Sequence, residues 1–179
     1  MIRKSLYCID FKALEDGKHS FSFFIDDAFF ALFPESSVNK AAVKAEITMF
    51  KQPQSLRLSI NLDGTIHVQC DRCLDYFEMP INYETELNVQ FGDSSSDISD
   101  ADTDITLAES ELEIVLDKHF FDYINLCVPT RKIHSKDENG NRNCNVEMME
   151  LLNKHKLEEN ISDEEDIDPR WDSLRTLMN

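Results

Sequence analysis

Glycine is scarce in this chain, which has only four glycines in 179 residues. Loops that cradle nucleotide phosphates depend on closely spaced glycines, so a P-loop or dinucleotide-binding site is not expected. The chain also lacks an H-E-x-x-H motif and any recognisable Ser-His-Asp arrangement. Nothing in the sequence therefore predicts a hydrolase or nucleotide-dependent enzyme.

Long hydrophobic runs are missing as well. No apolar stretch approaches the roughly 20 residues needed to span a bilayer, and residues 1–5 do not begin an apolar secretory signal. Five cysteines are an odd number, and they are not spaced like the disulfide framework of a small secreted domain. We therefore expect a cytoplasmic protein with no membrane partner and no small-molecule substrate. In that compartment a C-x-x-C pair is more often a metal or catalytic pair than a disulfide.

Positive charge is in short supply, with 18 Lys and Arg against 35 Asp and Glu and a net charge of −17. The excess is concentrated in two blocks: residues 93–117 carry nine acids and no base, and residues 157–179 carry eight acids and two bases. Non-specific nucleic-acid binding depends on neutralising phosphates with Lys and Arg, so this composition excludes it. Any contact with RNA must use a local basic face or a protein partner.

The first half of the chain has the alternating pattern of β-strands. Apolar residues recur with a period of two in residues 43–49, 56–62, 66–68 and 81–91, and shorter strands are expected within residues 2–10 and 21–25. Gln52-Pro53-Gln54 indicates a turn, and Asp63-Gly64 predicts a two-residue hairpin. We therefore predict an α+β fold, in which an antiparallel β-meander, as an open sheet or a partial barrel, is covered by a few helices.

The second half is expected to be helical, with interruptions. Helices are predicted at 117–127 and 146–156, in addition to a short one at 28–33 in the first half, and Asp168-Pro169 has the pattern of a terminal helix start. The acidic interval 92–106 cannot bury enough surface to form a packed core, so it is predicted to be a flexible loop. We expect a single α+β domain over residues 1–156 with this flexible insertion. Residues 157–179 would form an acidic tail with a short terminal helix.

The most informative motif is the pair Cys70 and Cys73, between two strand-like segments. This is the spacing of a zinc knuckle, and zinc sites use Cys and His ligands in fours, often paired from separate loops. His134 and Cys144, both in one later polar loop, are the best candidates for the second pair. A structural zinc and a metal-free pair of thiols remain equally open at this point.

A thioredoxin-type redox role is the competing use of C-x-x-C. That role normally places the first cysteine at a helix N-terminus, whereas here the pair joins two strands. Asp71 and Asp75 would also raise the thiol pKa rather than lower it. Redox catalysis is therefore the weaker interpretation.

Taken in order, several motifs resemble the YceD family: C-x-R-C-L after a strand-rich half, a helix ending in Leu-x-x-Pro, a loop with His and Cys, and Asp-Pro-Arg-Trp-x-x-Leu after an acidic stretch. The residues that carry the resemblance are Cys70, Arg72, Cys73, Leu74, Leu126, Pro129, His134, Cys144, Asp168, Pro169, Arg170, Trp171, Leu174 and Leu177. The resemblance implies a bacterial cytoplasmic protein needed for accumulation of 23S ribosomal RNA. The gene of such a protein is commonly found beside that of a small large-subunit ribosomal protein. Some members have a second cysteine pair in the late loop, where this chain has His134 and Cys144.

These observations lead to one principal hypothesis, a non-enzymatic ribosome biogenesis factor that supports 23S rRNA synthesis, processing or stability. The expected partner is large-subunit rRNA, a basic ribosomal protein or a processing factor, and the acidic blocks would suit a basic protein by charge complementarity. The candidate contact residues are Arg72, Arg131, Lys132, Lys136 and Arg142. The alternatives are a zinc-stabilised protein-interaction module without an RNA role and, less favoured, a C-x-x-C thiol oxidoreductase.

Overall fold

The computed structural model describes residues 6–92, 104–136, 140 and 142–155. The chain divides into two compact units, Met1–Cys144 and Asn145–Asn179. The first unit contains β1 (Cys8–Asp10), β2 (Gly17–Ile25), α1 (Asp27–Phe30), β3 (Val38–Gln52), β4 (Ser55–Gln69), β5 (Tyr76–Phe91), β6 (Asp104–Leu107), β7 (Glu113–Val115) and α2 (Asp117–Leu126). The second contains α3 (Val146–His155).

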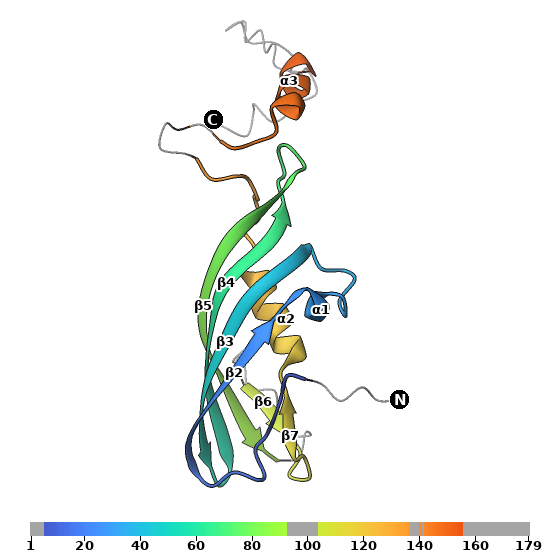
Figure 1. The fold of residues 1–179 in the computed structure, drawn as a ribbon. Helices are drawn as coiled ribbons and strands as arrows, with labels where there is room; N and C mark the ends of the chain where they lie inside the picture. Colours follow the sequence, from blue (N-terminus) through green and yellow to red (C-terminus); the bar gives the residue numbers. More distant parts are fainter. Residues whose placement is uncertain (1–5, 93–103, 137–139, 141, 156–179) are drawn as a thin grey trace, which may run out of the picture. The chain divides into compact units, whose positions relative to one another are not determined.

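The first unit is built on an open five-stranded sheet in the order β2-β3-β4-β5-β6 (Figure 1). Strands β2 to β5 form an antiparallel meander, and β6 adds in parallel at the edge of β5. A second, two-stranded sheet pairs β1 with β7, with Cys8 opposite Val115. The predicted α+β fold with an antiparallel meander is confirmed, and the sheet is open rather than a partial barrel.

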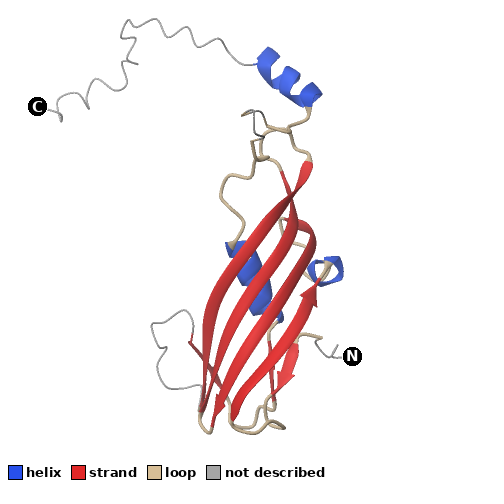
Figure 2. Ribbon diagram, turned by 60° about the vertical axis from the view of Figure 1, so that its left-hand side comes forward, coloured by secondary structure: helices blue, strands red, loops and turns tan. Residues whose placement is uncertain are grey.

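One face of the meander is buried and the other is exposed, as strict alternation along each strand requires. Ile47, Ile60 and Leu87 lie on the buried face and are almost fully inaccessible to solvent. Figure 2 shows α1 and α2 on one side of the sheet. Phe120 of α2 makes an edge-to-face contact with Tyr7 at 5.9 Å between ring centroids and belongs to the same hydrophobic core. The helices therefore cover the apolar face and leave the polar face open.

The hairpin predicted at Asp63-Gly64 is wrong. Strand β4 runs without a break from Ser55 to Gln69, with Gly64 opposite Val43 of β3. A Cβ at Gly64 would clash with the carbonyl oxygen of Ala42 and lie 2.7 Å from the Cα of Val43. This glycine therefore serves a close approach of two strands, which is the other common reason for glycine inside a strand. The stretch predicted as four strands, residues 40–91, contains three long ones, and β2 is the fourth strand of the meander.

The remaining limits also differ in places from those expected. Strand β6 begins at Asp104, inside the interval predicted as a flexible loop, because Ile105 and Leu107 pack against the core. Residues 93–103 of that interval and the predicted terminal helix lie outside the described residues. Helix α3 agrees with the predicted helix at 146–156. The proposed boundary between 156 and 157 stays a prediction.

Candidate metal centre

Cys70 and Cys73 lie in the tight turn that joins β4 to β5, and both side chains are buried. The backbone N–H of Cys70 donates to the carbonyl of Asp75 at 2.9 Å, and the N–H of Leu74 donates to the carbonyl of Cys70 at 3.0 Å. Leu74 has a φ of 63°, a left-handed conformation that is uncommon for residues other than glycine. These constraints turn the chain sharply enough to place both thiols on the same side of the turn.

The loop that follows α2 brings His134 and Cys144 to the same point. The Nδ1 atom of His134 lies 3.6 Å from the Sγ atom of Cys73 and 3.7 Å from the Sγ atom of Cys144. All four candidate ligand atoms, including Sγ of Cys70, lie within 4.8 Å of one another. Zinc bonds of about 2.3 Å to sulfur and 2.0–2.1 Å to nitrogen in a tetrahedron place sulfur and nitrogen about 3.6 Å apart. The Cys₃His donor set therefore fits zinc in both chemistry and spacing.

Side chains and backbone groups around this cluster hold the late loop against the turn. Arg142 donates from Nη1 to the carbonyl of His134 at 2.6 Å, and Lys136 pairs with Arg142 in a single β-bridge. The ring of Phe77 packs beside the imidazole of His134, with 4.6 Å between centroids. Such contacts orient metal ligands and are as characteristic of a metal site as the ligands themselves. Phe77 is absent from the sequence-based candidates, because its place in a strand pattern identifies it only as core.

The pKa values of two thiols in the cluster, Cys70 and Cys144, are shifted in opposite directions. Burial acts to raise the pKa of Cys70, but the backbone N–H groups of Cys73, Arg72 and His134, together with the His134 side chain, lower that pKa to about 6. Burial raises the pKa of Cys144, and its neighbours Cys70 and Cys73 raise it further. The expectation that Asp71 and Asp75 would raise the pKa of the first thiol pair is wrong for Cys70, because its hydrogen bonds together outweigh the effect of burial. A readily formed thiolate is also what a metal ligand requires.

The predicted contact residues gather around the same end of the sheet but differ in their availability. Lys132 is tied to Asp71, and Arg142 is engaged with the carbonyl of His134. Arg72, Arg131 and Lys136 have exposed side chains. The structure thus divides the five basic residues into two that stabilise the loop and three that are accessible to a partner.

Of the other motif residues, Leu74 occupies the left-handed position of the turn, and Pro129 lies just beyond the end of α2. Asp168, Pro169, Arg170 and Trp171 lie outside the described residues, as do Leu174 and Leu177.

None of the helices that the structure describes is long and apolar enough to cross a membrane. All five cysteines are free thiols.

The comparisons with known proteins agree with this picture. The sequence model of one family, described as "Large ribosomal RNA subunit accumulation protein YceD", matches residues 58–178. No curated protein and no solved structure shows a significant match to the chain. The matched region is more than half of the chain and includes all four candidate ligands and the terminal motif. The chain therefore belongs to the YceD family.

Proposed function

We propose that this protein is a non-enzymatic factor that supports the accumulation of 23S ribosomal RNA, through its synthesis, processing or stability. The family match carries the proposal, because the family is described by large ribosomal RNA subunit accumulation. The partner would be the RNA itself, a basic ribosomal protein or a processing factor. A cytoplasmic location is part of the same proposal.

The proposal includes a structural zinc ion held by Cys70, Cys73, His134 and Cys144. These ligands come from two loops that are far apart in sequence, so the ion would fasten the late loop to the end of β4. Four protein ligands leave no open position for water, which is why the site suits a structural rather than a catalytic metal. The accessible residues Arg72, Arg131 and Lys136 would then be presented on a rigid end of the sheet.

The direct test is to quantify 23S and 16S rRNA, and to profile ribosomal particles on gradients, in cells with and without this chain. We expect a selective loss of 23S rRNA and of large subunits. Complementation with Cys73→Ser should fail if the fastened loop is needed. Complementation with Cys127→Ser should succeed, because Cys127 is not one of the four clustered residues and its thiol donates to the carbonyl of Tyr123. An unchanged rRNA profile without the chain would overturn the proposal.

An interaction module without an RNA role is the second candidate, and the acidic composition favours it. The two candidates differ in where the protein sediments. A factor for the large subunit would co-sediment with its precursor particles at low salt and be released as salt rises. A module without this role would stay in the soluble fractions at every salt concentration.

A further inference from the structure

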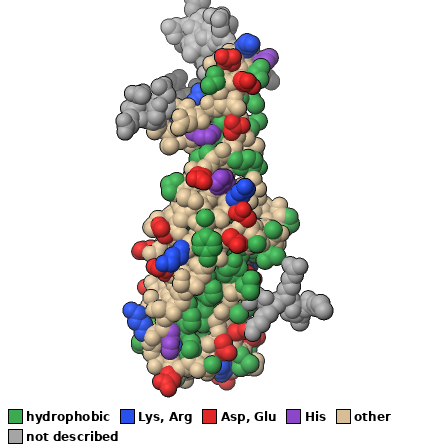
Figure 3. Space-filling model, viewed as in Figure 1, with side chains coloured by type: hydrophobic (Ala, Val, Ile, Leu, Met, Phe, Trp, Pro, Cys, Tyr) green, Lys and Arg blue, Asp and Glu red, His purple; other side chains and the backbone are tan. Residues whose placement is uncertain are grey.

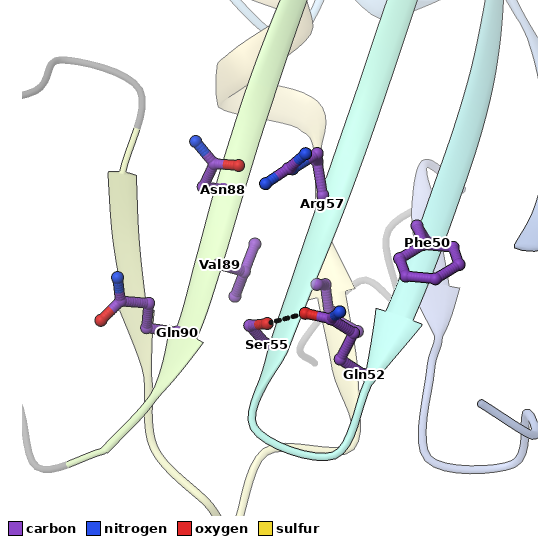
Figure 4. Close-up of a pocket in the computed structure, with 8 residues that line it drawn as sticks. Phe50, Gln52, Ser55, Arg57, Asn88, Val89 and Gln90 are labelled. Atoms are coloured by element: carbon purple, nitrogen blue, oxygen red, sulfur yellow. Dashed lines mark hydrogen bonds between the residues drawn. The ribbon is translucent and has the colours of Figure 1, made fainter. Parts of the chain in front are cut away.

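The open face of the sheet carries one row of side chains unlike the rest. The register places Lys18 of β2, Phe50 of β3, Arg57 of β4 and Asn88 of β5 directly beside one another. All four belong to the alternating positions that point away from the core. Figure 4 shows Phe50, Arg57 and Asn88 side by side across three strands, with the guanidinium group of Arg57 turned toward Asn88.

Phe50 is the unusual member of this row, because 48% of its side chain is exposed on a polar sheet face. It is flanked by a cation on each side, Lys18 and Arg57. Neither cation takes part in an ion pair among the described residues. An aromatic face between two unpaired cations is the arrangement that stacks a nucleobase and holds its phosphates.

A shallow hollow beside this row supplies hydrogen-bonding groups. Its volume is about 290 Å³, and its lining includes Phe50, Arg57, Asn88, Gln52 and Gln90. Amide side chains both donate and accept, as the edge of a nucleobase requires. Among the described residues, none that lines the hollow carries a carboxylate.

Charge along the sheet points to the same place. On β2 to β5 the row and the two rows beside it on the same face contain two cations and one carboxylate. The two neighbouring rows are Ser20, Thr48, Ser59 and Glu86, and Gln52, Ser55 and Gln90. Asp104 of β6 is the register partner of Asn88 and adds a second carboxylate residue at the edge of the row. The next two rows contain Glu46, Glu84 and Asp63 against Lys44 alone. In a chain of net charge −17, cations and carboxylates are therefore balanced at this end of the face, whereas the next two rows have an excess of carboxylates. Figure 3 shows basic side chains as isolated spots on the surface it displays, so an RNA contact there has to be local.

We propose that Phe50, with Lys18, Arg57 and Asn88, binds a nucleotide of single-stranded RNA on the open face of the sheet. The base stacks on the ring of Phe50, Asn88 and the neighbouring amides contact its edge, and Lys18 and Arg57 hold the adjoining phosphates. This inference rests on the role in rRNA accumulation proposed above and names the chemistry of its partner. Basic side chains and an aromatic ring favour RNA over a basic protein, which the cations would repel.

The test is fluorescence anisotropy of a short fluorescein-labelled single-stranded RNA of mixed sequence, titrated with the purified full-length protein at several salt concentrations. Phe50→Ala should weaken binding about tenfold, within the range expected for loss of one base–aromatic stack, with the salt dependence unchanged. Phe50→Tyr should restore it. Arg57→Gln should weaken binding and reduce the slope of log K against log salt by about 0.7, the value for one phosphate contact.

Phe24→Ala is the matched control, because Phe24 is also an exposed aromatic residue on β2, next to Lys44 in a row that contains Asp63. Its affinity should equal that of the wild type. Equal losses for Phe24→Ala and Phe50→Ala, tight binding of the same RNA as a duplex, or no binding at low salt would each overturn the inference; the last outcome would assign the row to a protein partner.

The outcome is separable from that of the proposed function. If Phe50→Ala binds RNA like the wild type while loss of the chain still depletes 23S rRNA, only the nucleotide site is wrong. If loss of the chain leaves 23S rRNA unchanged, the proposed function is wrong whatever the anisotropy shows.

Discussion

Asp71 and Lys132 are joined by three contacts although they are 61 residues apart in sequence. The N–H of Asp71 donates to the carbonyl of Lys132 at 2.7 Å, and the N–H of Lys132 donates to the Asp71 carboxylate at 2.6 Å. The Nζ atom of Lys132 lies 3.5 Å from the same carboxylate. Because Asp71 follows Cys70 and Lys132 precedes His134 by two residues, these contacts align the two halves of the metal cluster.

Removing the Asp71 carboxylate should therefore weaken zinc binding. We expect Asp71→Ala to lower the zinc affinity by about 10–100-fold, as loss of an orienting contact does in other metal sites. Asp71→Asn keeps an acceptor for the Lys132 N–H and loses only a half-exposed ion pair, so its affinity should fall by at most about fivefold. Competition with a chromogenic chelator measures both, and an Asp71→Ala protein that binds zinc as tightly as the wild type would contradict this account.

Zinc itself should be present and stabilising. Protein purified without chelators should contain about one zinc per chain, and Cys144→Ser should contain much less, by elemental analysis. Because metal binding to a loop-closing site contributes to folding, the chelated protein should unfold at a lower temperature and reload with release of protons. Cys127→Ser should match the wild type in both measurements. A chelated protein with an unchanged melting temperature would show that the cluster needs no metal.

Gly64 should tolerate no side chain. Because a Cβ there would overlap the backbone of β3 at Ala42 and Val43, Gly64→Ala must push two paired strands apart. We expect a loss of about 3 kcal/mol in the free energy of unfolding, at the upper end for overpacking. Gly92→Ala is the control, since nothing lies within 4 Å of the corresponding Cβ. Urea denaturation of the two variants gives the comparison, and equal stabilities would disprove the close approach.

Leu74 should be replaceable by glycine at no cost to folding. Its φ of 63° strains any residue that has a Cβ by about 1–2 kcal/mol. Glycine removes this strain, but part of the gain in stability is lost because glycine gives the unfolded chain more conformational freedom. Leu74→Gly should therefore raise stability by about 0.5–1 kcal/mol, and the β-branched Leu74→Val should lower it by about 1 kcal/mol. The control is Leu32→Val, at a similarly exposed leucine without a positive φ. If glycine and valine had the same effect at position 74, the strain would be refuted.

His119 should make stability depend on pH. Burial lowers its pKa below the ordinary value of 6.5, and Lys118 lowers the pKa too, while Asp122 and a hydrogen bond from the imidazole to the Val115 backbone oppose the shift. Below pH 6.5 the unfolded chain takes up a proton that the folded chain resists. The contribution of neutral His119 to the free energy of unfolding is therefore fully present above pH 6.5. It is lost as the pH falls toward the lower pKa of the folded state.

The measurement is urea denaturation at pH 7.5 and pH 5.5. The loss of stability between these values should be smaller in His119→Gln than in the wild type. His155→Gln, at an exposed histidine of α3, should lose as much as the wild type. A His119→Gln protein with the wild-type pH dependence would contradict the prediction.

Local patterns were sufficient for much of this fold. The period of two in β3 to β5, the turn at Gln52-Pro53-Gln54 and the apolar face of α2 each depend on neighbouring residues, and each is present in the structure. The hairpin prediction at Asp63-Gly64 failed because it, too, used only neighbouring residues. A glycine required for a turn and a glycine required for contact with another strand look identical in sequence, because the difference lies in Ala42 and Val43 across the sheet.

The candidate site divides in the same way. The sequence by itself determined the ligand types, because the C-x-x-C spacing and the composition of the late loop are local. Only the tertiary structure decided that His134 and Cys144 meet Cys70 and Cys73, that Asp71 aligns them, and that Phe50 lies between Lys18 and Arg57. Each of these depends on strand register or on loop closure over many residues. Those contacts form when the whole sheet pairs and buries its apolar face, an outcome that no single stretch of sequence records.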